Sequence, residues 1–294
     1  MNHGRLELKA ETKVAFQGEL GAYSQSAVYS FFGRDSVKEV MPLPTLQRVF
    51  SELCSDPEMN PSKPNFAVVP IENSTAGSVG ETFDLLVSKD VKIIGETAVP
   101  IQHAFVIHRN ADLKGIKKVI SHPQALAQCR EYLDAHGWQQ TAVYDTAGAV
   151  KMIRDQNLLD TGAIASELSS EIYGLKLAER SVEDDHSNRT RFIVVVSAPE
   201  SSDLLEPSGN DKTSVIFSTK HSPGSLVRAL SALSFRGINL SRIESRPIKS
   251  KPWEYYFYVD FDGHLKEERC KQAVEDLQTQ TLELKILGSY KRAV

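Results

Sequence analysis

Cysteine and long hydrophobic runs are both scarce in this chain. Its 294 residues include three cysteines, at positions 54, 129 and 270, which form no C-x-x-C pair. An odd number at wide spacing argues against a disulfide framework and favours the reduced thiols of a cytosolic protein. No stretch approaches the ~20 apolar residues of a membrane helix, and the first residues, MNHGRLELKAETK, lack the apolar core of a secretory signal. We therefore expect a cytoplasmic protein without a membrane partner.

Positive charge is limited too. The chain has 34 Lys and Arg residues against 38 Asp and Glu residues, a formal net charge of −4. This balance provides no general attraction for nucleic acid, and no block of basic residues is long enough to act as a basic tail. We expect no nucleic-acid partner, and an anionic ligand has to be held by groups that are placed locally.

Motifs of metal and cofactor sites are missing from the sequence. There is no G-x-S-x-G, no P-loop and no dinucleotide fingerprint. His103 and His108 lie five residues apart on a predicted strand and should project to opposite faces, while His122 lies in a turn and His136 ends a predicted helix. Since no pair has the spacing of a zinc site, we interpret these histidines as packing residues near helix ends. We expect no metal and no cofactor.

What is present divides the chain in two. The segment APESSDLLEPSGNDK, at 198–212, is rich in Pro, Ser, Asp and Gly, as interdomain linkers are. We predict a first domain at 12–198, a linker at 199–211 and a second domain at 212–291. With 41% hydrophobic and 24% charged residues overall, the composition is that of ordinary globular domains.

The first domain alternates short apolar runs with helical patterns, which is typical of α/β proteins. A helix is predicted from about Ala22 to its end at Gly33. Another is predicted as one helix up to His136, with Pro123 in its first turn. The predicted strands are KVAFQG at 13–18, NFAVVPIEN at 65–73, VKIIGETAV at 91–99, QHAFVIH at 102–108, GAIAS at 162–166 and TRFIVVV at 190–196.

The second domain has a regular order of predicted elements: strand, helix, two strands, helix, strand. Its first helix is predicted with Ser222 as N-cap, Pro223 in the first turn and Gly237 just beyond the end. The order βαββαβ is that of the ferredoxin-like fold. The chain is thus predicted to be α/β throughout.

Polar residues lead into the last strand of the first domain. The stretch NRTRFIVVV, at 188–196, begins with an amide, a hydroxyl and two guanidinium groups. Because side chains alternate along a strand, Asn188 and Thr190 share one face, and Arg189 and Arg191 share the other. One interpretation is that these are ordinary polar groups where a strand meets solvent.

Four further turns favour a binding site instead. GELGAYSQ, IENSTAGS, SHPQAL and AIAS each follow an apolar run with small polar residues. Such turns gather along one edge of an open α/β sheet, where ligands bind, and the N–H groups at helix starts suit a carboxylate. Each turn alone has a local explanation, but together with 188–191 they indicate a polar cleft for an anion.

Taken in order, these stretches resemble the prephenate dehydratase family, including its arogenate dehydratase members, with a C-terminal ACT domain. The resemblance covers about 13–290 and rests on GAYS, PIENS, SHPQAL, TRF at 190–192, GSLV at 224–227 and ESRP at 244–247. It implies a carbon–oxygen lyase that converts prephenate to phenylpyruvate in phenylalanine biosynthesis, losing a carboxylate and a hydroxyl. It also implies feedback inhibition by L-phenylalanine.

The resemblance implies a fold as well. The first domain should be a two-lobed catalytic domain like a type II periplasmic binding protein, hinged by two crossing strands, with the active site between the lobes. Lobe 1 is expected at about 12–96 and 188–198, and lobe 2 at about 97–187. The ACT domain is implied to bind phenylalanine at an interface between two chains, so we expect a homodimer or a homotetramer.

Thr190 matches the threonine to which the family assigns catalysis, and its hydroxyl can donate one hydrogen bond to the departing oxygen. Arg191 is directed away from it. It either reaches a substrate carboxylate around the strand edge, which we favour, or pairs with an acid behind the strand. The implied substrate-binding residues are Asn73, Ser74, Thr75, Ser121, Gln124, Ser166, Asn188, Arg191 and Phe192.

In the ACT domain, backbone groups at the start of the first helix are implied to anchor phenylalanine, together with Asn239 from the facing strand. Residues 244–246 lie next to that site and are expected to carry the signal. Ser225 replaces the commoner alanine of the motif, a small change. The implied allosteric residues are Gly224, Ser225, Leu226, Val227, Asn239, Glu244, Ser245 and Arg246.

Two alternatives stay open. Arogenate, in which an ammonium group replaces the keto oxygen, is a second possible substrate, because GAYS, SHPQALAQC and PLPTLQRVF look like the plant-type branch of the family. A non-enzymatic small-molecule sensor has the same cleft and ACT domain. Thr190 beside Asn188 favours the enzyme, since a sensor needs no positioned donor.

Overall fold

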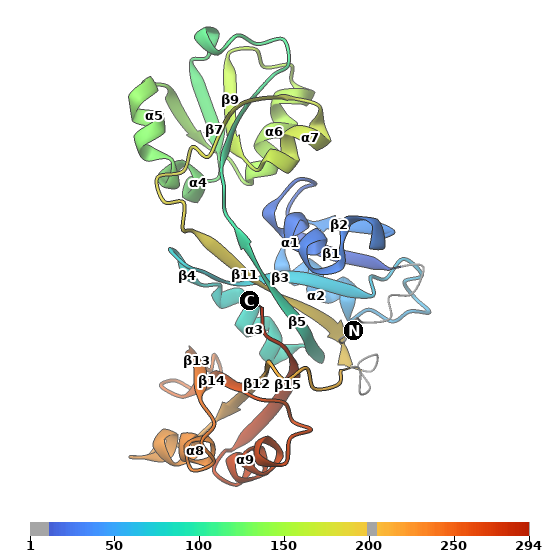
Figure 1. Cartoon of the computed structure of the whole chain (residues 1–294), viewed down its shortest axis with the longest axis vertical. Helices are drawn as coiled ribbons and strands as arrows, with labels where there is room; N and C mark the ends of the chain where they lie inside the picture. The colour runs from blue at the N-terminus through green and yellow to red at the C-terminus, as the bar shows by residue number, and fades with distance from the viewer. Residues whose placement is uncertain (1–11, 199–204, 294) are drawn as a thin grey trace.

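The computed structural model describes residues 12–198 and 205–293. Three β-sheets follow one another along the long axis of the molecule, each with its own helices (Figure 1). We call the first sheet with its helices lobe 1, the second lobe 2, and the third the C-terminal domain. Lobe 1 lies between the other two (Figure 1). Part of the predicted linker, 199–204, falls outside the described residues.

Lobe 1 is built on a six-stranded sheet. Its elements are β1 (Lys13–Gln17), α1 (Tyr23–Phe32), η1 (Arg34–Ser36), β2 (Glu39–Leu43), α2 (Leu46–Leu53), β3 (Phe66–Asn73), β4 (Gly77–Ser78), α3 (Gly80–Ser88), β5 (Val91–Pro100) and β11 (Arg189–Ser197). The strand order is β2-β1-β3-β11-β5, with β4 paired to β3. β11 runs antiparallel to both neighbours and is almost wholly buried, which explains its apolar run.

Lobe 2 has a five-stranded sheet of order β10-β6-β9-β7-β8. Its elements are β6 (Ala104–Ile107), η2 (Leu113–Gly115), β7 (Lys118–Ser121), α4 (Pro123–Gln128), α5 (Arg130–His136), β8 (Gln139–Ala142), α6 (Thr146–Asp155), β9 (Thr161–Ala165), α7 (Glu167–Tyr173) and β10 (Lys176–Arg180). The single helix predicted up to His136 is wrong, because the chain leaves the helical conformation at Cys129. The Asp184 carboxylate then accepts hydrogen bonds from the Arg130 and Glu131 N–H groups and starts a second helix.

The chain crosses between the lobes twice. It enters lobe 2 after β5 and returns before β11, and the two crossings are joined where the Ile101 N–H donates to the Asn188 carbonyl at 2.9 Å. β5 stays paired with β11 as far as Pro100, so lobe 1 extends slightly beyond the predicted limit at residue 96. The predicted two-lobed arrangement is confirmed.

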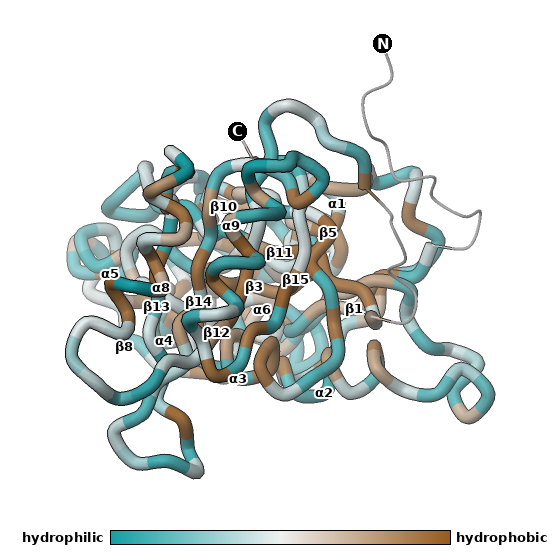
Figure 2. The backbone as a smooth tube through the Cα atoms, turned by 90° about the horizontal axis from the view of Figure 1, so that it is seen from below, coloured by the Kyte–Doolittle hydropathy of each residue, from teal (hydrophilic) through white to brown (hydrophobic). Residues whose placement is uncertain are grey.

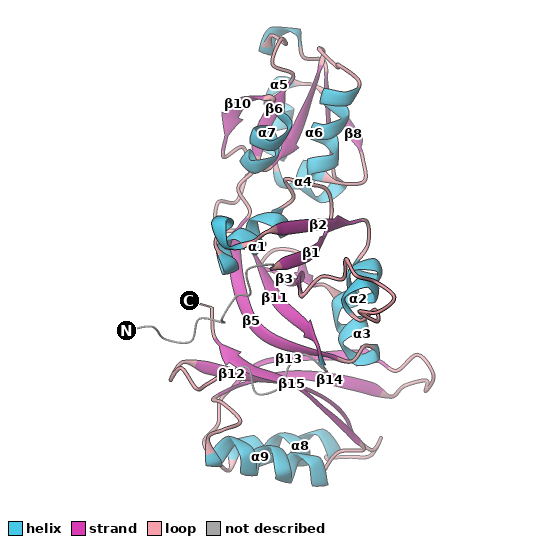
Figure 3. Ribbon diagram, turned by 90° about the vertical axis from the view of Figure 1, so that its right-hand side faces the viewer, coloured by secondary structure: helices cyan, strands magenta, loops and turns pink. Residues whose placement is uncertain are grey.

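The C-terminal domain is a four-stranded antiparallel sheet with two helices on the face away from lobe 1 (Figure 3). Its elements are β12 (Asp211–Ser218), α8 (Ser225–Ser234), β13 (Leu240–Pro247), β14 (Tyr255–Asp262), α9 (Glu268–Thr279) and β15 (Glu283–Lys291). This confirms the predicted ferredoxin-like order. The predicted N-cap is wrong: α8 begins at Ser225, and Gly224, with a left-handed φ of 77°, takes the N-cap position.

Lobe 1 and the C-terminal domain share one hydrophobic cluster. Tyr258, Leu287 and Tyr290 of the C-terminal domain pack with Ile71 and Phe83 of lobe 1, among others. Strands in the interior carry most of the hydrophobic colour in Figure 2, and peripheral loops are mostly hydrophilic.

The backbones of β15 and β5 approach closely at Gly288. A Cβ at this position would lie 2.2 Å from the Ile93 carbonyl oxygen, and φ is 149°, so only glycine fits. The C-terminal domain is therefore docked on lobe 1 backbone to backbone. No helix within the described ranges is long and apolar enough to span a bilayer.

Candidate active site

A small cavity of about 120 Å³ lies between the two lobes, beside the crossing strands. Among the residues that the structure describes, no lysine, arginine or acid lines it. The lining residues are Tyr23, Asn73 and Thr190 of lobe 1, Ile101 at the crossing, and His103, His122, Gln124, Ala125, Gln128 and Thr146 of lobe 2. The cleft expected from the polar turns is therefore polar but uncharged.

Thr190 lies opposite Asn73 at the end of β3 and opposite Val99 on β5. The Asn73 Nδ2 atom donates to Thr190 Oγ1 at 2.9 Å and to Asn188 Oδ1 at 2.8 Å. The predicted convergence of Asn188 and Thr190 on one face is thus observed. Because the threonine oxygen accepts from an amide, its own proton stays available for a molecule in the cavity.

The same asparagine fixes the turn that follows β3. Asn73 Oδ1 accepts from the Ala76 N–H at 2.8 Å, the Thr75 N–H at 3.1 Å and the Thr75 hydroxyl at 2.8 Å. Ser74 adds a link to β11, since its N–H donates to the Arg189 carbonyl at 2.9 Å. The turn and the start of β11 therefore form one hydrogen-bonded unit around Thr190.

His103 and Tyr23 form another part of the cavity lining. The Tyr23 hydroxyl lies 2.8 Å from His103 Nδ1 and 2.8 Å from the Gln102 carbonyl oxygen, and His103 Nε2 lies 2.9 Å from Gln128 Oε1. Burial lowers the pKa of His103, against smaller opposing effects of Gln128 and Glu183, so the ring favours the neutral form. Burial also raises the pKa of the Tyr23 hydroxyl well above its usual value.

The ten-residue helix α1 begins at this cavity with Tyr23 and has no side-chain cap, whereas the start of α6 is already capped by the Asp145 carboxylate, which accepts from the Gly148 N–H at 2.6 Å. The N-terminal end of a helix carries partial positive charge and unpaired N–H groups, which favour anions. Gln124 of α4 adds an exposed side-chain amide. An uncharged cleft can therefore hold a carboxylate without an arginine.

Only part of the predicted substrate set lines the cavity. Asn73 and Gln124 do, as does the predicted catalytic residue Thr190, and Ser74, Thr75 and Asn188 adjoin the cavity through hydrogen bonds around Asn73 and Asn188. Three predicted residues are used by the fold instead. Ser121 Oγ donates to the Ile164 carbonyl at 2.6 Å, Ser166 caps α7, and Phe192 packs in the core of lobe 1.

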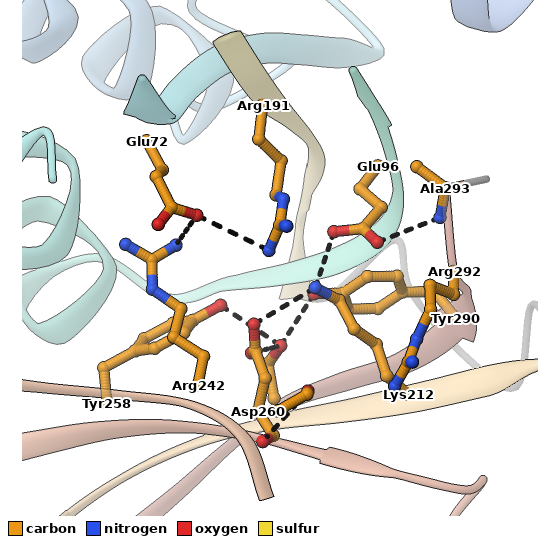
Figure 4. Close-up of polar contacts among 12 residues, drawn as sticks. Glu72, Glu96, Arg191, Lys212, Arg242, Tyr258, Asp260, Tyr290, Arg292 and Ala293 are labelled. Carbon is orange, nitrogen blue, oxygen red and sulfur yellow. Dashed lines mark hydrogen bonds and ion pairs between the residues drawn. The ribbon is translucent and has the colours of Figure 1, made fainter. Parts of the chain in front are cut away.

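Arg191 is a further correction. Its side chain forms an ion pair with Glu72, Nη1 to Oε2 at 3.5 Å, and points toward the C-terminal domain (Figure 4). Of the two options open from the sequence, the structure shows the pairing with an acid behind the strand. Arg191 therefore leaves the proposed substrate set.

Several lining residues were not predicted. Tyr23 and Gln128 lie within or beside the stretches GAYS and SHPQALAQ, so those stretches contained the signal. His103 was interpreted as a packing residue near a helix end, which is wrong: it precedes β6, is 2% exposed and contacts Tyr23. His122 does cap a helix, since it accepts from the Gln124 N–H. Among the described residues, no group of three or more His, Cys, Asp or Glu could hold a metal ion.

The lobes are in contact around the cavity. The Ser166 hydroxyl of lobe 2 donates to the Gly21 carbonyl of lobe 1 at 2.5 Å. At Gly21, where φ is 89°, a Cβ would lie 2.6 Å from Ser169 Cα, so a larger residue would push the lobes apart. This is a closed arrangement of the two lobes.

A second cavity, of about 220 Å³, lies at the start of α8 in the C-terminal domain. The predicted effector residues Gly224, Ser225, Leu226 and Val227 all line it, together with Tyr255 and Phe257 among others.

The other predicted effector residues lie elsewhere in the same chain. Asn239 contacts Asp262 at the far end of the sheet. Glu244 bonds to Ser78 and Arg246 to Asp84, both in lobe 1. Ser245 pairs with Phe257, which does line the cavity. One chain alone therefore does not bring the eight predicted residues together.

Comparison with known proteins agrees with this architecture. The family model for prephenate dehydratase matches residues 14–200. The chain belongs to the prephenate dehydratase family. It is 37% identical over 291 residues to the bifunctional chorismate mutase/prephenate dehydratase of Aquifex aeolicus, covering 98% of this chain and 76% of that protein. It is 36% identical over 292 residues to arogenate dehydratase/prephenate dehydratase 2 of Arabidopsis thaliana, covering 96% and 73%.

Two solved structures are similar over nearly the whole chain. Prephenate dehydratase from Arthrobacter aurescens, in complex with L-Phe, has a TM-score of 0.85 and 29% identity and covers 96% of this chain and 90% of that one. GqqA, described as a novel type of quorum quenching acylase, also has a TM-score of 0.85 and 29% identity, with 95% and 97% covered. The predicted fold class, a periplasmic-binding-protein-like domain followed by an ACT domain, is confirmed.

Proposed function

We propose that this chain is a prephenate dehydratase and that Thr190 donates a hydrogen bond to the departing hydroxyl of prephenate. The observation that carries the proposal is the bond from Asn73 Nδ2 to Thr190 Oγ1, which leaves the threonine proton free to donate to a molecule in the cavity between the two lobes. Membership of the family supports the reaction.

The reaction needs orientation more than strong acid–base chemistry. The bond from the ring to the carboxylate breaks and releases CO₂, its electron pair enters the ring, and the carbon–oxygen bond of the hydroxyl breaks at the other end. Hydroxide leaves with one proton as water, and the ring becomes aromatic. A threonine alcohol is too weak an acid for full ionisation, so we assign it a hydrogen bond or a relay through water.

The contacts of Thr190 favour a donor over a nucleophile. An alcohol that attacks a substrate needs an adjacent base to accept its proton. Among the described residues the side-chain bond to Thr190 Oγ1 comes from an amide N–H, which is a donor. The acylase activity named for GqqA is therefore not the function that this site supports best.

The lining of the cavity favours prephenate over arogenate. Within the described part of the chain no aspartate or glutamate lines it, so the ammonium group of arogenate would be desolvated without a counter-charge from the lining. The carboxylates of prephenate would meet the start of α1, the hydroxyls of Ser74 and Thr75, and the Gln124 amide.

Equal concentrations of prephenate and arogenate, each incubated with the purified chain, test this assignment. We expect phenylpyruvate from prephenate at a higher kcat/KM than phenylalanine from arogenate. The reverse order would make the chain an arogenate dehydratase. Binding of either compound without any product would favour the sensor.

We also propose that L-phenylalanine inhibits the enzyme from the cavity at the start of α8. The related structure solved with L-Phe supports this. Because Asn239 lies at the far end of its own sheet, a second copy of the chain has to supply it, which favours a homodimer or a homotetramer. Val227, Phe235 and Ile243 are 69%, 85% and 42% exposed in one chain, as expected for an interface. A cytoplasmic location also stays part of the proposal, supported by three cysteines that form no disulfide.

Asn239→Ala should therefore weaken inhibition by phenylalanine. The coupling between such sites is typically about 1–3 kcal/mol, or roughly 5–150-fold in affinity. We expect the variant to lose most of it, measured as the phenylalanine concentration that halves the rate. Unchanged inhibition would remove Asn239 from the effector site.

A further inference from the structure

A hairpin of lobe 1 connects the active site with the C-terminal domain. It consists of residues 72–78: the end of β3, the turn fixed by Asn73, and β4. Its tip carries Asn73, which bonds to Thr190 in the cavity. Its base carries Glu72 and Ser78, which lie opposite each other in the β3–β4 pair. Whatever holds Glu72 and Ser78 therefore also holds the tip.

The residues that hold this base come from β13 of the C-terminal domain. Arg242 Nη1 lies 3.4 Å from Glu72 Oε2, and Arg242 Nη2 donates to Ser78 Oγ at 3.1 Å. The Ser78 hydroxyl in turn donates to Glu244 Oε2 at 2.7 Å. Arg242 and Glu244 are two apart, so they project from the same face of β13, and together they contact both strands of the hairpin.

The surroundings of Arg242 make the contact with Glu72 costly to lose. The arginine side chain is 8% exposed, and its guanidinium lies over the Phe83 ring at 4.9 Å and near the Tyr258 ring at 5.8 Å. Nη1 is buried and makes no hydrogen bond, so the Glu72 carboxylate is its nearby counter-charge. A desolvated cation requires such a partner.

Glu72 also joins the hairpin to β11. Its carboxylate lies between Arg242 of β13 and Arg191 of β11 (Figure 4). Glu72 directly precedes Asn73, and Arg191 directly follows Thr190. Adjacent residues of a strand face opposite sides, so this ion-paired cluster lies on the back of the two strands whose front carries the Asn73–Thr190 bond.

We propose that Arg242 is a positioning residue for the active site: through Glu72 and Ser78 it holds the hairpin so that Asn73 directs the Thr190 proton into the cavity. The C-terminal domain is then part of the catalytic scaffold, beyond its proposed role in binding phenylalanine. The effect of Arg242 on kcat rests on the proposed function. Its effect on the order of the turn at 73–76 does not.

The proposal extends to inhibition. Glu244 contacts the hairpin through Ser78 and belongs to the predicted effector residues of β13. A ligand that shifts β13 therefore acts on the base of the hairpin directly. We expect Arg242→Gln to reduce inhibition by phenylalanine as well as turnover.

The test compares Arg242→Gln with Lys285→Met. Lys285 lies in the same domain interface, where Nζ donates to the Leu86 carbonyl at 2.8 Å at the end of α3, but it does not touch the hairpin. We expect Arg242→Gln to lower kcat roughly 10- to 100-fold with KM within about twofold, because small displacements of reacting groups cost that much. Lys285→Met should lose stability and keep kcat. Arg242→Lys, which retains the charge, should recover most of the rate.

Hydrogen exchange supplies a readout that needs no substrate. The Thr75 and Ala76 N–H groups, which donate to Asn73 Oδ1, should exchange faster in Arg242→Gln than in Lys285→Met. If the wild-type chain shows no turnover, the proposed function is contradicted, but the hydrogen-exchange comparison still tests the positioning role. Equal exchange in both variants, or an unchanged kcat in Arg242→Gln, would overturn the positioning role.

Ser78→Ala covers the case in which Arg242→Gln does not fold. Ser78 is exposed, so its loss should leave the fold intact while removing one contact of Arg242 and one of Glu244. We expect a smaller fall in kcat, about 2- to 5-fold, scaled down from the cost of larger displacements, and faster exchange of the same turn. Wild-type kcat and exchange in this variant would contradict the proposal.

Discussion

Lobe 1 has two interfaces, and they are built differently. Toward lobe 2 there are hydrogen bonds of neutral groups around the cavity, a small apolar contact of Ala147 and Leu20, and exposed ion pairs such as Lys151–Glu19 at the rim. Toward the C-terminal domain there is a shared hydrophobic cluster and a buried set of charges, in which Lys212 bridges Glu96 and Asp260 (Figure 4). Their side chains are 2–3% exposed.

Because of this difference we expect the interface between the two lobes to open and the interface with the C-terminal domain to stay closed. Neutral hydrogen bonds can be exchanged for bonds to water at little net cost, about 1 kcal/mol each. Separating the C-terminal domain from lobe 1 would expose the apolar surface of the common core to water and break the ion pairs of Lys212. We therefore expect lobe 2 to move relative to lobe 1 and admit substrate, and the C-terminal domain and lobe 1 to move as one body.

The largest expected effect is on the cleft side. Thr190→Ala removes the hydroxyl to which Asn73 donates at the cavity, and we expect kcat to fall roughly 10²- to 10⁴-fold, the usual range for a positioned proton donor. Substrate binding should change little. Steady-state kinetics with prephenate measure both, and Thr190→Ser, which keeps the hydroxyl, is the matched control. A near-wild-type rate for Thr190→Ala would exclude the donor role.

The next largest effect is at the C-terminal interface. Lys212→Met leaves Glu96 and Asp260 buried without their cation, and we expect a loss of about 3–5 kcal/mol in the free energy of unfolding. Urea denaturation checks this. A loss below 1 kcal/mol would mean that the buried charges do not hold the interface.

A pH effect of the cleft should be smaller. Burial lowers the pKa of His103 in the folded chain, so between that value and about 6.5, the usual value of the unfolded chain, the unfolded state binds more protons. Stability should therefore fall as the pH drops from 7 to 5. In His103→Gln the urea-measured fall should be shallower, and identical slopes for the two proteins would contradict a buried neutral ring.

The smallest effect is expected at the rim of the cleft. Lys151 and Glu19 are 39% and 38% exposed and lie 2.9 Å apart across the lobes. Exposed pairs contribute about 0–1 kcal/mol, so Lys151→Met should leave the urea midpoint almost unchanged. It is the matched control for Lys212→Met. A loss of stability as large as that of Lys212→Met would contradict the contrast between the two interfaces.

Local patterns predicted the elements that depend on local forces. Alternation along β11 correctly brought Asn188 and Thr190 together, and strand and helix order identified the ferredoxin-like domain. The polar turns predicted a polar cleft, but not that it is uncharged, since Arg191 was expected to reach the substrate. Each of these follows from the period of a strand or from turn chemistry, which a sequence carries directly.

Contacts between distant segments were not predictable in the same way. The break between α4 and α5 depends on Asp184, which lies far from these helices in the sequence. Arg191 meets Glu72 because β11 pairs with the distant strand β3 in a register that places these two residues opposite each other. The Ser121 and Ser166 hydroxyls donate to backbone carbonyl groups of segments that are distant in sequence. A serine in a turn looks the same in sequence whether it faces a ligand or a backbone.

Distances between spin labels test the contrast most directly. Arg48 on α2, Arg130 on α5 and Gln272 on α9 are exposed and report on lobe 1, lobe 2 and the C-terminal domain. The labels are attached in pairs to a variant that lacks the partly exposed Cys54. The distance between the two labels of each pair is then measured without and with phenylpyruvate. We expect the distance from 48 to 130 to be broad and to narrow on binding, while that from 48 to 272 stays single and unchanged. A fixed distance across the cleft, with movement between 48 and 272, would contradict the account.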